Sequence, residues 1–200
     1  MTAQLIILFL LSVLFLFSCK APKGFAKSYY KKNETILTGI EETYRTLYKQ
    51  KPFSIEFSDR SFKYISIEFI TDSLKYIYEF SLDETDLKDS LTKFGYDAKA
   101  IVSLISNMKS IECTWINNLD YFTNGKRKSL IFISIRPRRL DIPYNTKKYY
   151  ILTFYPQPQY YDKEGRLLEG RRLRKLRRLN EETFWRINDK VCYTLSDRFR

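Results

Sequence analysis

Apolar residues recur along the chain with two periods, and the longer, helical period predicts three main helices. The first spans 33–50, where Asn33 can cap the start and Pro52 ends the helix. A second spans 83–95 and a third spans 97–108. Both open on an aspartate, whose carboxylate favours the positive end of a helix. The apolar stripe of each helix is expected to face inward.

The shorter period, strict alternation of apolar and polar residues, predicts strands. Three alternating runs follow the first helix at 53–57, 64–69 and 74–80, and the connections between them are short and polar. This arrangement indicates an antiparallel meander with one buried face. Later runs predict strands at 112–116, 130–135 and 149–155. The run LIFISI is apolar on both faces, so we expect it in the middle of the sheet.

The C-terminal part predicts a hairpin and an extended run. The segment 160–168 fits a hairpin around the turn Asp162-Lys163-Glu164-Gly165. The run 185–195 is either one strand or a hairpin split at Asn188-Asp189, and the sequence leaves both open. The order of elements predicts an α+β fold with a largely antiparallel sheet of about six or more strands and three main helices.

The first eighteen residues differ from the rest because they carry no charge. Their apolar run, 5–17, is shorter than the ~20 residues that span a bilayer but fits the apolar part of a secretory signal. It ends in Leu16-Phe17-Ser18-Cys19, with leucine three residues before a cysteine and a small residue directly before it. In Leu16, Ser18 and Cys19 the chain resembles bacterial lipoprotein precursors.

This resemblance implies cleavage before Cys19 and attachment of lipid to that cysteine. The chain then divides into a signal peptide (1–18), a lipidated cysteine with a flexible basic tether (19–32) and a single domain (33–200). The implied partner is the membrane, reached through the lipid anchor. Acidic residues follow the cysteine in related surface-exposed lipoproteins, and none follows it here, which implies a periplasm-facing protein in the cell envelope.

The composition limits which reactions, ligands and partners are expected for this chain. The chain has no histidine, which removes the usual general base near neutral pH and the commonest metal ligand, so we predict no catalytic residue, metal or cofactor. Its net charge is +12, but the export signal argues against nucleic acid as a partner. We expect a binding or scaffolding module rather than an enzyme. The alternative is a hydrolase or transferase acting on an envelope polymer through carboxylates, with Asp83/Asp86 and Glu41/Glu42 as the visible pairs.

Two cysteines remain in the mature chain, Cys113 and Cys192. In an oxidising compartment they can form one disulfide, and the equal alternative is two buried thiols, because free cysteine packs as a small apolar residue. The sequence leaves both alternatives open.

A strongly basic segment near the C-terminus is the remaining candidate site. Residues 166–179 read RLLEGRRLRKLRRL, and leucines three residues apart can face the domain while the basic side chains point outward. Such a patch fits anionic lipid, an anionic glycan or an acidic envelope protein. The alternative is a solvated helix whose arginines pair with the acidic region 52–123. The candidate anion-binding residues are Arg171, Arg172, Arg174, Lys175, Arg177 and Arg178.

Overall fold

The fold was analysed in a computed structural model that describes residues 23–71, 74–82, 85–123, 126–135, 149–168 and 183–196. The elements follow one another as α2 (Lys23–Gln50), β1 (Phe53–Phe57), β2 (Tyr64–Ile70), β3 (Lys75–Ser81), α3 (Asp86–Lys93), α4 (Ala98–Ser110), β4 (Cys113–Thr123), β5 (Lys126–Ile135), β6 (Tyr149–Phe154), β7 (Trp185–Arg186) and β8 (Val191–Ser196). The described part thus has three helices and an eight-stranded sheet, which confirms the predicted α+β class.

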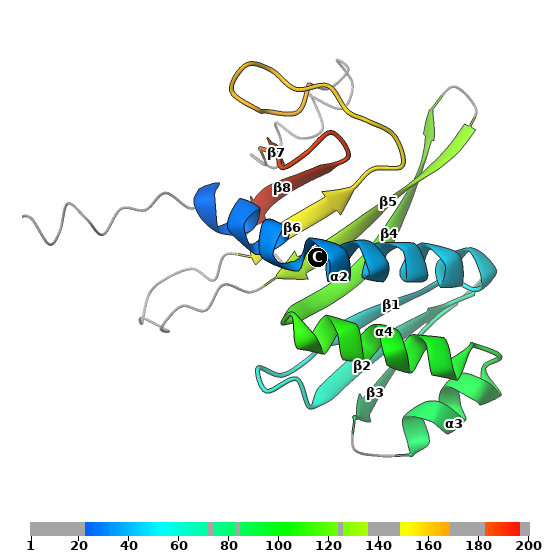
Figure 1. The fold of residues 1–200 in the computed structure, drawn as a ribbon. Helices are drawn as coiled ribbons and strands as arrows, with labels where there is room; N and C mark the ends of the chain where they lie inside the picture. Colours follow the sequence, from blue (N-terminus) through cyan, green and yellow to red (C-terminus); the bar gives the residue numbers. More distant parts are fainter. Residues whose placement is uncertain are drawn as a thin grey trace, which may run out of the picture.

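All neighbouring strands in the sheet are antiparallel, in the order β3-β2-β1-β4-β5-β6-β8-β7 (Figure 1). The meander β1–β3 forms one end, as its alternation predicts. The apolar run LIFISI forms most of β5, which lies between β4 and β6 as expected. At the other end Asn188 and Asp189 do split the last run, so β7 and β8 form a hairpin.

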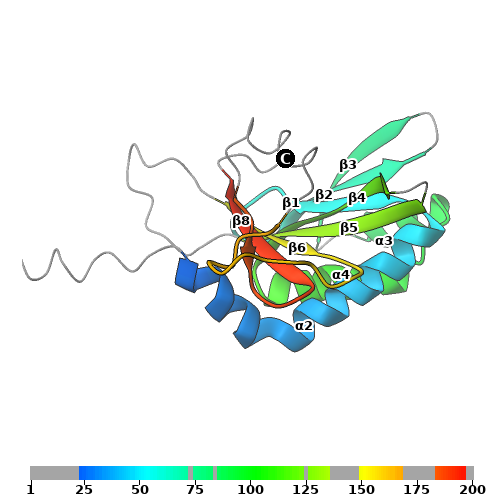
Figure 2. The same cartoon turned by 90° about the horizontal axis from the view of Figure 1, so that it is seen from above.

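The three helices cover one face of the sheet, giving a two-layer molecule (Figure 2). Alternate residues of each strand point toward the helices and form the helix-side core, which we define by buried residues such as Leu37, Tyr44, Ile67, Ile116 and Ile133. At its centre the Tyr44 hydroxyl donates to the Phe53 carbonyl oxygen at 2.6 Å. This bond satisfies a phenol that burial would otherwise leave without a partner. We call the opposite side of the sheet the outer face.

The helix α2 corrects the expectation of a flexible tether for residues 23–32, the described part of 19–32, because the chain is already helical from Lys23. Ala26 and Tyr30 are buried in the helix-side core, and the Phe25 and Tyr150 rings lie 4.8 Å apart between centroids. The packing of aromatic residues at helical spacing therefore makes this segment a helix, and the surrounding lysines do not prevent it. Asn33, expected to begin the helix, instead marks a kink, with φ −114° and ψ 16°.

The hairpin β4–β5 is longer than the predicted strands 112–116 and 130–135. Asn118 and Asp120 are poor strand formers, but polar contacts along β4 and across the hairpin hold them. The Asn118 amide donates to Asp120 at 3.1 Å, the Ser129 hydroxyl donates to Asn118, and Arg127 pairs with Asp120. The polar arms of this hairpin extend past the end of β6, whose pairing with β5 covers only Ile131–Ile135.

The loop between β1 and β2 is organised by the Asp59 carboxylate. It accepts the backbone N–H groups of Ser61 at 2.9 Å, Lys63 at 2.9 Å and Tyr64 at 2.8 Å, as well as the Ser61 hydroxyl. Slight burial acts to raise the pKa of Asp59, but these hydrogen bonds outweigh it and lower the pKa. Asp59 therefore fixes the loop in its charged form.

Candidate functional site

Two of the predicted sites lie outside the described residues. These are the lipidation site Cys19, together with the signal peptide 1–18, and the basic patch Arg171, Arg172, Arg174, Lys175, Arg177 and Arg178. Both stay predictions of the sequence. The predicted carboxylate pair Asp83/Asp86 is described only in part, because Asp83 falls outside the described ranges. Asp86 is exposed in the first turn of α3, where it favours the helix dipole.

The two remaining cysteines are free thiols on opposite faces of the sheet. Cys113 lies in the helix-side core, next to the carbonyl oxygen of Trp115 at 3.6 Å. Burial raises the pKa of Cys113 to about 12, so it is a neutral thiol at physiological pH. Cys192 lies in a smaller cluster on the outer face, with its sulfur 3.9 Å from the Tyr155 hydroxyl. Of the two alternatives that the sequence leaves open, this structure therefore has the buried thiols.

A groove of about 710 Å³ runs between α2 and two connecting segments, 154–158 and 188–191. Phe154 and Tyr155 supply buried aromatic rings, while Pro156 and Pro158 are exposed on its lining. The groove therefore has an apolar, aromatic part and a rigid proline part, supplied by the end of β6 and the segment that follows it.

Polar residues of both signs line the same groove. The basic residues are Arg45, Lys49 and Lys190, and the acidic residues are Glu41, Glu42 and Asp189. Three positive charges against three negative ones give a locally balanced site within a strongly basic chain.

Several of these polar side chains are held by neighbours. Glu41 pairs with Arg45 at 2.5 Å, which keeps both on the groove side of α2. The Asn188 amide donates to the Tyr30 hydroxyl at 3.2 Å and connects the β7–β8 turn to α2. Burial raises the pKa of Tyr30, an effect that the Asn188 bond partly offsets. Tyr30 is therefore a neutral hydrogen-bonding group.

The structure brings the predicted pair Glu41/Glu42 into this groove together with Asp189. Asp189 pairs with Arg186, and Glu41 with Arg45. Glu42 and Asp189 are exposed, whereas Glu41 is half-buried. The sequence did not indicate the groove, because its residues come from α2 and from segments more than a hundred positions later in the chain. In the sequence, Asn188 and Asp189 indicated only a possible hairpin turn.

The first half of α2 presents an exposed basic face next to the predicted lipidation site. Lys27, Lys31 and Lys32 are exposed, whereas Ala26 and Tyr30 on the opposite side are buried. The helix begins only four positions after Cys19. A fully extended chain of that length spans at most about 14 Å.

No match is found when the chain is compared with protein-family models, with curated proteins and with solved structures. Among the described residues, no helix is both long and apolar enough to cross a bilayer. The same part of the chain contains no group of three or more cysteine or acidic side chains able to hold a metal ion.

Proposed function

We propose that the protein is a lipid-anchored module of the cell envelope that binds another envelope component close to the membrane. The observation that supports this most directly is the position of α2. A helix whose apolar face belongs to the core begins four residues after the predicted lipidated cysteine, so the domain is held against the bilayer rather than at the end of a long tether.

Charge supports the same orientation. Lys27, Lys31 and Lys32 lie on the first half of α2, within reach of head groups if Cys19 carries lipid. Each basic group near an anionic bilayer contributes about 1 kcal/mol. The predicted basic patch within 171–178 adds to this attraction, toward anionic lipid, an anionic glycan or an acidic envelope protein.

The groove supports binding as the activity. Its exposed prolines beside balanced charges suit a polar chain, such as a glycan, that packs on the prolines and exchanges hydrogen bonds with the charged side chains. The competing proposal is carboxylate catalysis on an envelope polymer, because Glu42 and Asp189 line the same groove. Glu42→Gln and Asp189→Asn variants distinguish the two. Binding without turnover supports the module, and polymer cleavage that is lost in both variants supports the enzyme.

The anchor is tested by Cys19→Ala in cells that receive a radiolabelled fatty acid. We expect the parent to carry label and to fractionate with membranes, and Cys19→Ala to lose the label. Cys192→Ala is the matched control and should keep it, because Cys192 is buried. A Cys19→Ala protein that is still processed and labelled would overturn the anchor.

The basic face is tested by vesicle flotation of residues 20–200, which contain every described element. Replacing Lys27, Lys31 and Lys32 by glutamine should weaken binding to anionic vesicles about tenfold or more at low salt. The matched control replaces three exposed lysines of the other two helices, Lys88, Lys93 and Lys99. Equal loss in both sets would show that only net charge matters.

A further inference from the structure

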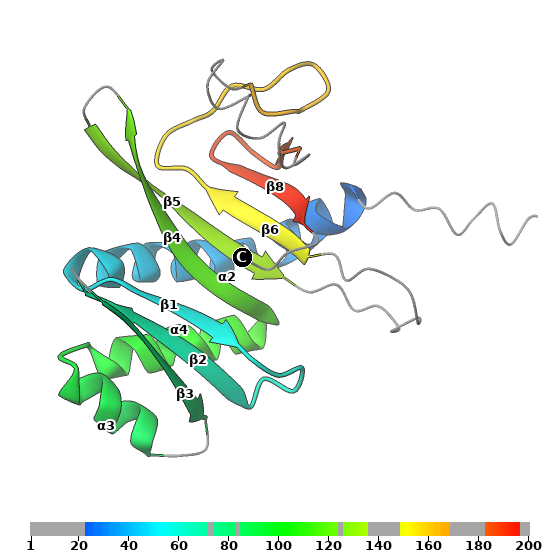
Figure 3. The same cartoon turned by 180° about the vertical axis from the view of Figure 1, so that it is seen from behind.

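The strand β3 is an open edge of the sheet with an apolar surface. Among the described residues it pairs only with β2, and Figure 3 shows it at the end of the sheet opposite to β8. Three successive side chains are exposed, Tyr76 by 41%, Ile77 by 57% and Tyr78 by 36%. Exposed edges of this kind pair readily with another strand unless a bulge, a proline or a cover prevents it. The β2–β3 register runs without a shift from Tyr64↔Ser81 to Ile70↔Lys75.

The backbone groups that point away from β2 can be identified from the bonds at the two ends of the strand pair. Thr71 N–H donates to the Leu74 carbonyl oxygen and Leu82 N–H donates to the Lys63 carbonyl oxygen, both at 2.9 Å. Because hydrogen-bonded pairs alternate in an antiparallel ladder, the even-numbered residues of β3 bond to β2. The N–H and C=O groups of Lys75, Ile77 and Glu79 therefore point outward from the edge.

We infer that two copies of this chain pair through β3, antiparallel and about a two-fold axis at Ile77. In this register the outward groups of Ile77 face those of Ile77 in the second copy, and Lys75 lies opposite Glu79. The strands then exchange about six backbone hydrogen bonds. A two-fold interface requires a surface that is complementary to itself, and the sequence Lys-Tyr-Ile-Tyr-Glu has this property.

Side chains on both faces favour the same register. On the outer face, Lys75 and Glu79 form two symmetry-related ion pairs on either side of the Ile77 contact. On the helix side, Tyr76 lies opposite Tyr78, at a position where side chains approach most closely. Moving the axis to Tyr78 would place Ile77 opposite Glu79 and Lys75 opposite Ser81, which loses both ion pairs.

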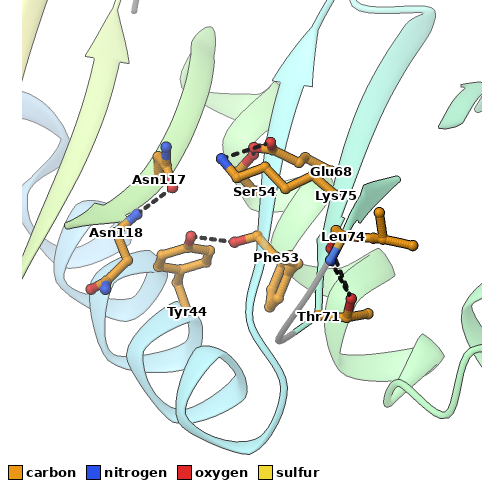
Figure 4. A network of polar contacts seen from close by, with 9 residues as sticks. All are labelled: Tyr44, Phe53, Ser54, Glu68, Thr71, Leu74, Lys75, Asn117 and Asn118. Atoms are coloured by element: carbon orange, nitrogen blue, oxygen red, sulfur yellow. Dashed lines mark hydrogen bonds and ion pairs between the residues drawn. The ribbon is translucent and has the colours of Figure 1, made fainter. Parts of the chain in front are cut away.

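Lys75 is already held on the outer face of the sheet, where the proposed ion pairs lie. The Lys75 ammonium lies 3.1 Å from a Glu68 carboxylate oxygen, and the Ser54 hydroxyl donates to the same carboxylate at 3.1 Å (Figure 4). This contact directs Lys75 over the outer face, where Glu79 also projects by the alternation of the strand. Glu79 is exposed and has no ion pair among the described residues, so it is available to the second copy.

The pairing is tested with the full chain, whether or not Cys19 carries lipid, by sedimentation equilibrium in density-matched detergent. We expect the parent to dimerise, and Lys75→Glu or Glu79→Lys to raise the dimer Kd about tenfold or more, because like charges then lie opposite each other twice. An equimolar mixture of the two single variants should dimerise again, since each copy then meets its opposite charge. Lys88→Glu, an exposed lysine of α3, is the matched control and should dimerise like the parent.

Circular dichroism of each variant checks that the fold is retained, as expected for exposed positions. A monomeric parent, single variants that dimerise like the parent, or a mixture that stays monomeric would each overturn the inference. The test is independent of the proposed anchor, because both residues belong to β3 and the variants leave Cys19 and the lysines of α2 unchanged.

Discussion

Thr153→Val is expected to stabilise the protein, because it removes a buried hydroxyl that bonds to nothing in the described part of the chain. Thr153 lies on β6, its side chain is on the outer face, and it is fully buried. Ser134 on β5 and Thr194 on β8, the strands on either side, carry unpartnered hydroxyls of the same kind. Each of these hydroxyls is shielded from solvent and makes no hydrogen bond to a described residue.

The size of the effect follows from this lost hydration. An unsatisfied buried polar group costs about 1–3 kcal/mol, and valine keeps the shape of threonine with a methyl group in place of the hydroxyl. Valine is also a good strand former. We therefore expect Thr153→Val to raise the free energy of unfolding by about 1–2 kcal/mol. For a domain of this size each kcal/mol corresponds to about 2–4 °C in Tm.

Urea unfolding of the parent and the variant measures this, with an unchanged m-value as the sign that only stability has changed. Thr114→Val is the control, because the Thr114 hydroxyl is also buried but donates to the Ser134 carbonyl oxygen at 3.1 Å. It should lower the free energy of unfolding by about 1 kcal/mol. If both variants lose stability equally, the Thr153 hydroxyl has a partner and the reasoning fails.

Three further predictions concern the backbone, the pH dependence and the thiols. Gly39 lies inside α2 with open space around it, so Gly39→Ala should raise the free energy of unfolding by about 0.5–1 kcal/mol. Gly95 has φ +71°, so Gly95→Ala should lower the free energy of unfolding by about 1 kcal/mol. Thermal melts that rank the two variants otherwise would contradict this prediction. Asp59 has a lowered folded-state pKa, so its contribution is present above its unfolded pKa and is lost as pH falls through the folded value. Asp59→Asn should therefore destabilise at neutral pH and match the parent in acid, and a deficit that is constant with pH would refute this. Cys113 and Cys192 should resist a thiol reagent in the native state and both react after unfolding without reductant, whereas a disulfide would leave them unreactive until reduced.

Most of the fold could be predicted where local patterns were unambiguous. The segment β1–β3 has strict alternation and short polar connections, which predicted the antiparallel meander that the structure contains. The start of α4 was equally clear, since Asp97 caps it by accepting the Ala100 N–H at 3.0 Å. In these segments the local preference and the tertiary structure agree.

The first half of α2 was missed because composition and packing give opposite indications. Its lysines, with Pro22 and Gly24, are typical of a tether, yet Phe25, Ala26 and Tyr30 form an apolar face. That face is recognised only when the strands that cover it are known. The groove and the complementary edge could not be found in the sequence either, because they depend on which segments the sheet brings together and on which strand is left at its end.

The packing of α2 also has a consequence for the order in which the protein folds. This helix is the first described element of the chain, yet Tyr30 contacts Phe154 and Phe25 contacts Tyr150, both on the sixth strand to be made. Contacts that close so long a loop form late in folding, after the local meander and hairpin contacts. We expect Tyr30→Ala to speed unfolding while leaving the refolding rate nearly unchanged. The unfolding rate, and with it the lifetime of the folded protein, then depends on the contacts between the first half of α2 and β6.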